Sequence, residues 1–245
     1  MSDALTVFVV ALATALATGL GALPFLFFKE MTPTWVGVSN ALAAGFMLGA
    51  SVGLFYEGGL ASVGRTVAGG ILGALFVLGS RLILHERKDL HVGALRGAGA
   101  RSAVMILAVM TIHSFTEGVG VGVSFGGGRD LGILIALAIA IHNIPEGLAI
   151  SLTLVPRGAS VRSAAAWSVL SSVPQPLMAV PAYLGVQVFE PVLPVGLGFA
   201  GGAMLWLVVS QIVPDARSTA SDTVVGGVAV AGVLVMTALG ALIVV

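Results

Sequence analysis

The chain has 245 residues, of which 58% are hydrophobic and 9% are charged, and its mean hydropathy is +1.09. So little polar surface could not cover a water-soluble domain, and the composition therefore predicts an all-α integral membrane protein in contact with lipid. The formal net charge is zero, which argues against a nucleic-acid partner. Cysteine is absent, and this excludes disulfides, thiolate metal sites and cysteine nucleophiles.

The chain divides into apolar stretches of membrane length. A membrane-spanning helix needs about 20 mostly apolar residues, and breaks at charged and turn-forming clusters leave eight such stretches. They are residues 4–28, 35–56, 66–84, 102–125, 131–155, 163–186, 195–213 and 224–245. Together they form a single transmembrane domain over residues 1–245. No basic region of a signal peptide precedes the first stretch, so we expect it to remain as a span.

Lys and Arg indicate the orientation of these spans, because cytoplasmic loops carry an excess of both residues. With the amino terminus outside, nine of the eleven Lys and Arg fall in inner loops. The inner set is Lys29, Arg81, Arg87, Lys88, Arg96, Arg101, Arg157, Arg162 and Arg217, and the outer set is Arg65 and Arg129. This bias predicts eight transmembrane helices with both termini outside. A seven-span chain without the seventh or eighth segment is the main alternative.

A short motif occurs twice, in the fourth and in the fifth predicted span. The first copy places His113 four residues before Glu117, and the second places His142 four residues before Glu146. Residues four apart share one face of a helix, so each copy presents an imidazole and a carboxylate side by side. Both pairs fall near the middle of their spans, where ionisable groups are most costly and a functional site is the default interpretation.

Metal binding gives these four groups a common reason to lie at matching depth. A divalent cation would neutralise both carboxylates while neutral imidazoles donate lone pairs, and such donors suit zinc and its first-row neighbours. Binding would require deprotonated histidines. Two simpler interpretations stay open: polar residues satisfied by a neighbouring helix, or His–Glu ion pairs that hold two helices together.

Glycine and proline residues lie within or near the two copies of the motif. Gly118 and Gly147 follow the two glutamates, and their lack of a side chain would let another helix or the ion come close. Pro145 cannot donate a backbone hydrogen bond and is expected to kink the fifth span. Pro174 and Pro176 predict a similar distortion of the sixth span, and broken helices beside mid-membrane polar groups are typical of transporter sites.

Other polar groups in the spans are weaker candidates. Ser114 and Asn143 follow the two histidines and would either bind a second ion or hydrogen-bond between helices. Gln175 and Gln211 are neutral amides, for which structural hydrogen bonding is the better interpretation. Met47 offers a thioether, although one methionine in an apolar helix more often serves packing.

Several charged residues lie at the ends of spans. Glu57, Asp130 and Asp215 are expected to face water, where they would attract cations to a vestibule. His85 and His91 fall in the basic inner loop and are expected to be solvated.

At these residues the chain resembles the ZIP (Zrt/Irt-like protein) family of divalent metal transporters, and most of all its prokaryotic branches. The family carries His-x-x-x-Glu-Gly motifs in its fourth and fifth spans, and residues 142–147 match one form of that motif at every position. Residues 43–48 resemble the second-span segment whose methionine contacts metal, and residues 202–204 and 211–215 resemble the seventh span. The resemblance covers essentially the whole chain.

This resemblance implies a three-plus-two-plus-three arrangement of helices with inverted repeats, in which the fourth, fifth and neighbouring spans slide against a dimerising scaffold. It implies a homodimer and a primary metal site with Met47 at its edge; the other ligands are His113, Glu117, His142 and Glu146. Family members often hold a second ion, for which the matching positions here are Ser114, Asn143 and Gln175. Because serine and glutamine replace the usual asparagine and glutamate, we expect this second site to be weak or absent.

The function predicted from these features is transport of zinc or a similar divalent ion toward the cytoplasm, across the plasma or inner membrane. Zn²⁺, Cd²⁺, Fe²⁺, Mn²⁺ and Co²⁺ are the candidate substrates, and no prosthetic group or enzymatic activity is expected. One alternative is an intramembrane zinc-dependent hydrolase, but the sequence lacks a His-Glu-x-x-His motif. Another is a proton-coupled carrier of a non-metal substrate that uses the His–Glu pairs as a relay.

Overall fold

The computed structural model describes residues 3–28, 32–86 and 98–243. Within these ranges the chain is helical and contains no strand. The helices are α1 (Asp3–Thr18), the 3₁₀ helix η1 (Gly19–Leu26), α2 (Pro33–Glu86), α3 (Ala98–Gly127), α4 (Arg129–Leu154), the 3₁₀ turn η2 (Val155–Arg157), α5 (Val161–Ser171), α6 (Pro174–Val188), α7 (Val192–Leu207), the π-helix η3 (Val208–Ile212), α8 (Val213–Arg217) and α9 (Asp222–Ile243). The predicted all-α class is confirmed.

Seven helical segments of the described ranges are long and apolar enough to cross a membrane. Their outward faces carry large apolar side chains, such as Val52 and Leu60, which are 67% and 69% exposed. Such exposure would be costly in water and is favourable in lipid. The chain is thus built as a multi-pass α-helical membrane protein.

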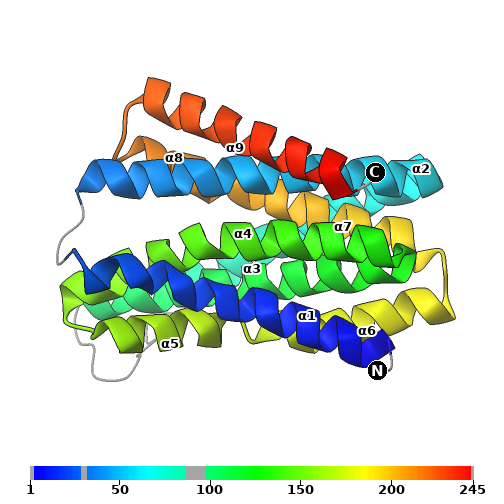
Figure 1. Ribbon diagram of the computed structural model, residues 1–245, viewed down its shortest axis with the longest axis horizontal. Coiled ribbons are helices and arrows are strands. Elements are labelled where there is room, and N and C mark those ends of the chain that lie inside the picture. Colours follow the sequence, from blue (N-terminus) through cyan, green and yellow to red (C-terminus); the bar gives the residue numbers. More distant parts are fainter. Residues whose placement is uncertain (1–2, 29–31, 87–97, 244–245) are drawn as a thin grey trace.

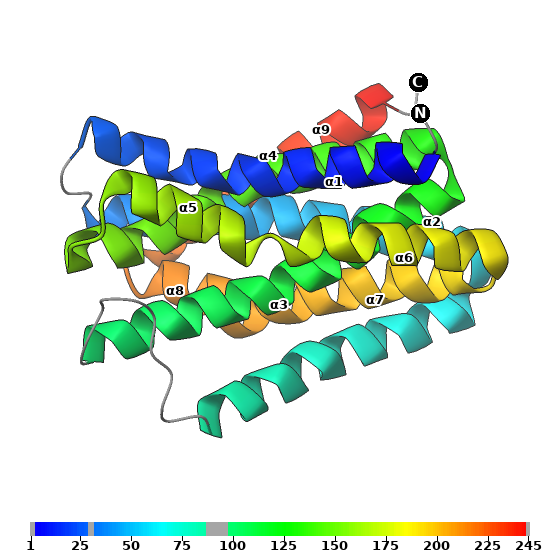
Figure 2. The ribbon, with the colours of Figure 1, turned by 90° about the horizontal axis from the view of Figure 1, so that it is seen from below.

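One of the seven segments, in α2, is too long for a single crossing. At about 1.5 Å per residue, its helical run would greatly exceed a bilayer of about 30 Å. The backbone of Ser62 is extended, with φ −169° and ψ 107°, and this residue separates two helical arms. Figures 1 and 2 show the second arm running in the opposite direction to the first, and in Figure 2 α7 lies between the two arms. The reversal lies between the second and third predicted spans, 35–56 and 66–84.

The predicted distortion of the sixth span is confirmed. Helix α5 ends at Ser171, and α6 begins at Pro174, so residues 172 and 173 interrupt the span. Proline is suited to the first turn of a helix because its missing N–H would have had no partner there. In contrast, α4 continues through Pro145 and ends at Leu154.

Close approach between backbones joins the two arms of α2 to α7 and α9. A Cβ atom on Gly69 or Gly73 would overlap the carbonyl oxygen of Val195 or Phe199, and one on Gly45 would overlap that of Ala229. Lipid gives apolar helices no hydrophobic reason to associate, so small residues that permit such contact stabilise the bundle. The many glycines of the chain are partly explained by this packing.

Helices α3 and α4 lie in the interior of the bundle, between α2, α7 and α9 on one side and α1, α5 and α6 on the other (Figure 1). Both described ends of the chain, Asp3 in α1 and Ile243 in α9, lie toward the same end of the molecule (Figure 1). The predicted inner loop includes residues 87–97, and His91, Arg87, Lys88 and Arg96 lie outside the described residues, as does Lys29. The interior position of α3 and α4 is what buries the duplicated motif.

Candidate metal site

Helices α3 and α4 bring the two copies of the motif together. His113 and Glu117 lie one turn apart on α3, and His142 and Glu146 lie one turn apart on α4. All four side chains are buried, with exposed fractions of 0 to 3%. One ligand atom from each residue lies within 4.8 Å of the other three. The i, i+4 spacing and the packing of α3 on α4 therefore suffice to build a compact group of two imidazoles and two carboxylates.

The contacts cross between the two helices. Nε2 of His113 lies 2.8 Å from Oε1 of Glu146 and 3.2 Å from Oε1 of Glu117. Nε2 of His142 contacts the same Glu117 oxygen. The two imidazole rings are 6.2 Å apart between centroids and inclined by 41°. Glu117 is thus the residue that touches both histidines.

Several of these atoms have no hydrogen bond in the described part of the chain. Nε2 of His113 and Oε1 of Glu146 are close but not aligned for a hydrogen bond, and Oε2 of Glu117 is also buried without a partner. A buried, unsatisfied carboxylate oxygen is costly in an apolar environment. The donor set and its spacing fit a divalent cation of the zinc type, which takes imidazole nitrogen and carboxylate oxygen at about 2.0–2.2 Å.

The glycines after the two glutamates allow neighbouring helices to approach. A Cβ atom on Gly118 would overlap the backbone oxygen of Gln175 in α6. A Cβ atom on Gly147 would overlap the carbonyl oxygen of Thr18, at the end of α1. Of the two roles predicted for these glycines, the structure thus shows the approach of another helix. Helix α6 consequently packs closely on α3, and α1 packs closely on α4, next to the predicted ligands.

The predicted second-site residues adjoin this group. Ser114, Asn143 and Gln175 are all buried. The Asn143 amide donates to the carbonyl oxygen of Thr14 at 2.8 Å and to Oε1 of Gln175 at 3.3 Å. Asn143 on α4 therefore connects this helix to α1 and α6. Of the two roles considered for Asn143, the structure thus shows hydrogen bonding between helices.

Met47 lies in α2 and is completely buried in the main hydrophobic cluster, with neighbours that include Leu54 and Ala50. Its assignment to the edge of the primary site stays a prediction. Glu57 and Asp130 lie on helices α2 and α4, and Asp130 is exposed in the first turn of α4.

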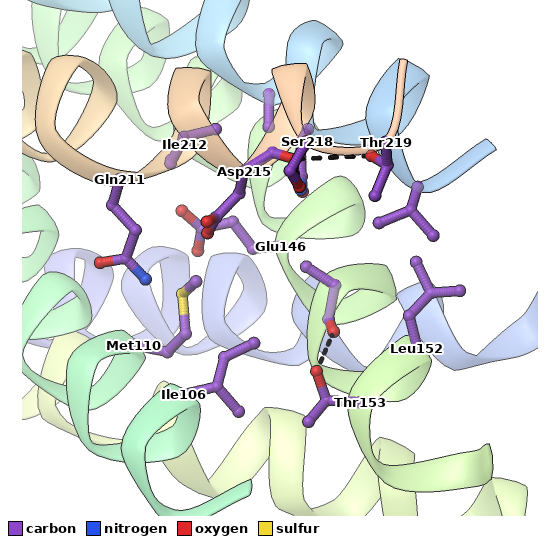
Figure 3. Close-up of a pocket in the computed structure, with 14 residues that line it drawn as sticks. Ile106, Met110, Glu146, Leu152, Thr153, Gln211, Ile212, Asp215, Ser218 and Thr219 are labelled. Atoms are coloured by element: carbon purple, nitrogen blue, oxygen red, sulfur yellow. Dashed lines mark hydrogen bonds between the residues drawn. The ribbon is translucent and has the colours of Figure 1, made fainter. Parts of the chain in front are cut away.

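A cavity of about 240 Å³ extends from Glu146 to one end of the bundle, and we call it the Glu146 cavity. Side chains from α2, α3, α4 and the η3–α8 segment line it, and Asp215 and Ser218 lie at its exposed end (Figure 3). Asp215 is exposed, as predicted, and lines this cavity, whereas its role in attracting cations to a vestibule stays a prediction. Met110 also faces this cavity, and sequence reasoning missed it; its position one turn before His113 was the available signal.

Comparison with known proteins decides the family. Residues 83–244 match the ZIP zinc transporter family. The chain belongs to this family. It is 47% identical over 240 residues to a putative zinc transporter of Arabidopsis thaliana, a match that covers 97% of this chain and 39% of the plant protein. The chain thus spans about two fifths of the length of that relative.

Two further relatives are informative. The zinc transporter GufA of Myxococcus xanthus is 34% identical over 223 residues, which cover 85% of this chain and 87% of GufA. The human zinc transporter ZIP11 is 37% identical over 89 residues, which cover 36% of this chain and 26% of ZIP11. The predicted resemblance to the ZIP family is therefore confirmed.

Proposed function

We propose that this ZIP-family chain transports Zn²⁺, or a similar first-row divalent cation, across a cell membrane toward the cytoplasm. The observation that carries the proposal is the buried group of His113, Glu117, His142 and Glu146, whose ligand atoms lie within 4.8 Å of one another. These four residues are the proposed primary ligands. The three relatives described above, one a putative zinc transporter and two zinc transporters, support the same substrate class.

The charges of the group suit a divalent ion. Two carboxylates supply two negative charges and two neutral imidazoles supply nitrogen donors, so the bound ion leaves a neutral assembly in the low-dielectric interior. Coordination of the ion offsets the free-energy cost of burying unpaired carboxylates, and this cost returns when the ion leaves.

We further propose eight membrane crossings with both termini outside. The reversal of α2 at Ser62 divides the longest of the seven membrane-length segments into two crossings. Arg157, Arg162 and Arg217 lie at the end of the bundle where the Glu146 cavity opens, whereas Arg129 follows α3 at the opposite end. The excess of Arg at the cavity end supports a cytoplasmic position for that end. The three-plus-two-plus-three arrangement and a homodimer complete this proposal.

Alternating access would follow from movement of one part of the bundle against the other. Helices α1, α3, α4 and α6 are joined through Gly118, Gly147 and the Asn143 hydrogen bonds. Between α3 and α7 the close contacts involve side chains, such as those of Val123 and Ala200 against Gly196 and Gly120. Sliding of α3 along α7 would carry the metal site between the two sides of the membrane.

Uptake into proteoliposomes tests the function. The full chain would be reconstituted, and entry of Zn²⁺, Cd²⁺, Fe²⁺, Mn²⁺ and Co²⁺ would be followed for the unmodified protein, His142→Ala and Glu146→Ala. We expect uptake that both variants abolish. Metal uptake that both variants retain would refute the assigned site. Absence of metal uptake, together with proton flux or hydrolysis, would instead favour one of the two alternative functions, a proton-coupled carrier or an intramembrane hydrolase.

Retention of Zn²⁺ by the purified protein gives a second readout. Equilibrium binding should give one tightly held ion per chain, because neutral Gln175 replaces the carboxylate that a second site would need. A stoichiometry of two would show that Ser114, Asn143 and Gln175 still hold an ion.

A further inference from the structure

Helix α1 and the α5–α6 pair both lose their regular α-helical form at one level of the bundle. Helix α1 gives way after Thr18 to η1, a 3₁₀ helix of 8 residues, although 3₁₀ runs longer than about three or four residues are uncommon. The sixth span is interrupted at residues 172 and 173. Oγ1 of Thr18 lies 2.9 Å from Oγ of Ser172, and both residues are buried. A hydrogen bond therefore joins the two irregular points, in segments that run side by side in Figure 2.

The direction of this hydrogen bond follows from a second bond of Ser172. A hydroxyl has one proton, and the Ser172 hydroxyl donates it to the Ser168 carbonyl at 3.2 Å. The Thr18 hydroxyl is therefore the donor between the two side chains. The Ser172 carbonyl accepts the N–H of Gln175 at 3.0 Å, across the interruption. Backbone groups that a helix break frees within a membrane need partners inside the protein. Ser172 thus stabilises the break, and Thr18 connects the break to the end of α1.

The end of α1 and the start of η1 also hold the turn of α4 that carries Glu146. A Cβ atom on Gly147 would overlap the Thr18 carbonyl oxygen. A Cβ atom on Gly21 would overlap the Ile144 carbonyl oxygen and the backbone of Gly147. These contacts lie on both sides of Glu146 in the sequence. The position of Glu146 therefore depends on where the α1–η1 junction lies.

The turn that carries Glu146 is weakly held by α4 itself. Pro145 lacks an N–H and so removes one backbone hydrogen bond from α4 at this level. Oε1 of Glu146 lies 2.8 Å from Nε2 of His113 but has no hydrogen-bond partner among the described residues. Because no aligned hydrogen bond fixes this oxygen, its place is set by the backbone of α4 and by the contacts of that backbone with η1.

We propose that Thr18 and Ser172 are positioning residues for the metal site. Their hydrogen bond fixes η1 against the interruption of the sixth span, and η1 in turn fixes the backbone on both sides of Glu146. Neither residue belongs to the group of four proposed ligands, so both act through α4. Removal of a group that orients a metal ligand typically weakens metal affinity by about ten- to a hundredfold. This inference rests on the proposed function, with Glu146 as a ligand.

Removal of either hydroxyl tests the positioning role. Thr18→Val and Ser172→Ala delete the hydrogen bond, whereas Thr18→Ser keeps it. Thr14→Val is the matched control, because Thr14 is also buried in α1 and its hydroxyl donates within that helix, to the Ala11 carbonyl at 2.7 Å. Equilibrium binding of Zn²⁺ to the purified full chain should weaken roughly tenfold in Thr18→Val and in Ser172→Ala. It should stay unchanged in Thr18→Ser and in the control.

Two further measurements separate positioning from general stability. Thermal unfolding in detergent would be recorded for the same variants, and Zn²⁺ binding would be repeated with Thr18→Val in a Glu146→Gln background. Because the hydroxyl acts through Glu146, Thr18→Val should weaken binding by no more than about twofold in that background. A roughly tenfold loss there would overturn the proposal. So would an unchanged Zn²⁺ affinity in whichever hydroxyl variant folds, whatever its thermal stability.

Failure of this inference is distinguishable from failure of the proposed function. If the unmodified chain binds and takes up Zn²⁺ and the hydroxyl variants behave like Thr14→Val, only the positioning role fails. If the unmodified chain neither binds nor transports a divalent ion, the proposed function itself fails.

Discussion

The bundle contains two regions that are packed alike but differ in polarity. The apolar region, α2, α7 and α9, is joined by backbone contacts at glycines such as Gly45, Gly69 and Gly73. The polar region, α1, α3, α4, α5 and α6, uses the same kind of contact at Gly118 and Gly147, but it also buries the four metal-site residues, Asn143 and Gln175. Close backbone packing is therefore a general device of this fold, whereas the four proposed primary ligands all lie in the polar region.

The surface between the two regions is formed by contacts between side chains. Phe76 of the apolar region stacks on Phe115 of α3, with ring centroids 5.3 Å apart, and also lies 5.6 Å from Phe199 of α7. Side-chain contacts at the boundary can change when rotamers change, whereas the close backbone contacts at glycines within each region leave no room for such changes. We therefore expect each region to keep its shape during transport while the side-chain contacts at the boundary rearrange.

The largest expected effect concerns Glu117, the residue that contacts both histidines. Glu117→Gln removes one of the two carboxylate charges and should lower Zn²⁺ uptake by about a hundredfold or more. Glu190→Gln is the control, because Glu190 is exposed between α6 and α7. Transport by Glu117→Gln at the rate of this control would show that the polar region does not carry the chemistry.

A smaller effect is expected from an added methyl group in the polar region. The Cβ of Gly147→Ala would overlap the Thr18 carbonyl, so α1 must move away from the helix that bears His142 and Glu146. We expect about 1–3 kcal/mol of destabilisation from overpacking and a roughly tenfold weaker Zn²⁺ affinity in the protein that remains folded. Thermal unfolding in detergent and equilibrium metal binding would measure the two effects separately.

The corresponding change in the apolar region should affect stability alone. Gly73→Ala would overlap the Phe199 carbonyl and should also cost about 1–3 kcal/mol. Gly79→Ala, in the same arm of α2, is the control, because a Cβ there meets no atom within 4 Å. Zn²⁺ affinity of folded Gly73→Ala should match that of the control. A large loss of affinity would mean that the two regions are rigidly coupled.

The smallest expected effect is a gain in the number of metal ions bound per chain. Gln175→Glu keeps an acceptor for the Asn143 amide, which lies 3.3 Å from Oε1, and adds a negative charge beside the metal site. Equilibrium binding should then rise from one to two ions per chain if this carboxylate is what the second site lacks. A stoichiometry that stays at one would assign Asn143 and Gln175 a purely structural role within the polar region.

The sequence predicted that the two His–Glu pairs lie side by side, and the structure brings them together, because the determinants of this arrangement are local. The four-residue spacing aligns His113 with Glu117 on any α-helix, and the repetition of the motif on an adjacent span requires only that the two helices pack. The interruption of the sixth span was predictable for a similar reason, because Pro174 restricts its own backbone and that of the preceding residue.

Features that depend on tertiary packing were not predictable in this way. Nothing in the composition of residues 208–212 distinguishes a π-helix from an α-helix, and Met110 looks like any apolar residue of its span. The Glu146 cavity forms only where α2, α3, α4 and the η3–α8 segment pack together.

The π-helix η3 also has a consequence for how ZIP sequences are compared. A π turn holds one more residue than an α turn, so the residues after it are rotated by about 100° relative to an uninterrupted α-helix. A relative in which this span is wholly α-helical would need one residue fewer to present the same face at Asp215. Such relatives should therefore align with this chain through a single-residue gap inside residues 208–212, a place where membrane spans ordinarily tolerate none.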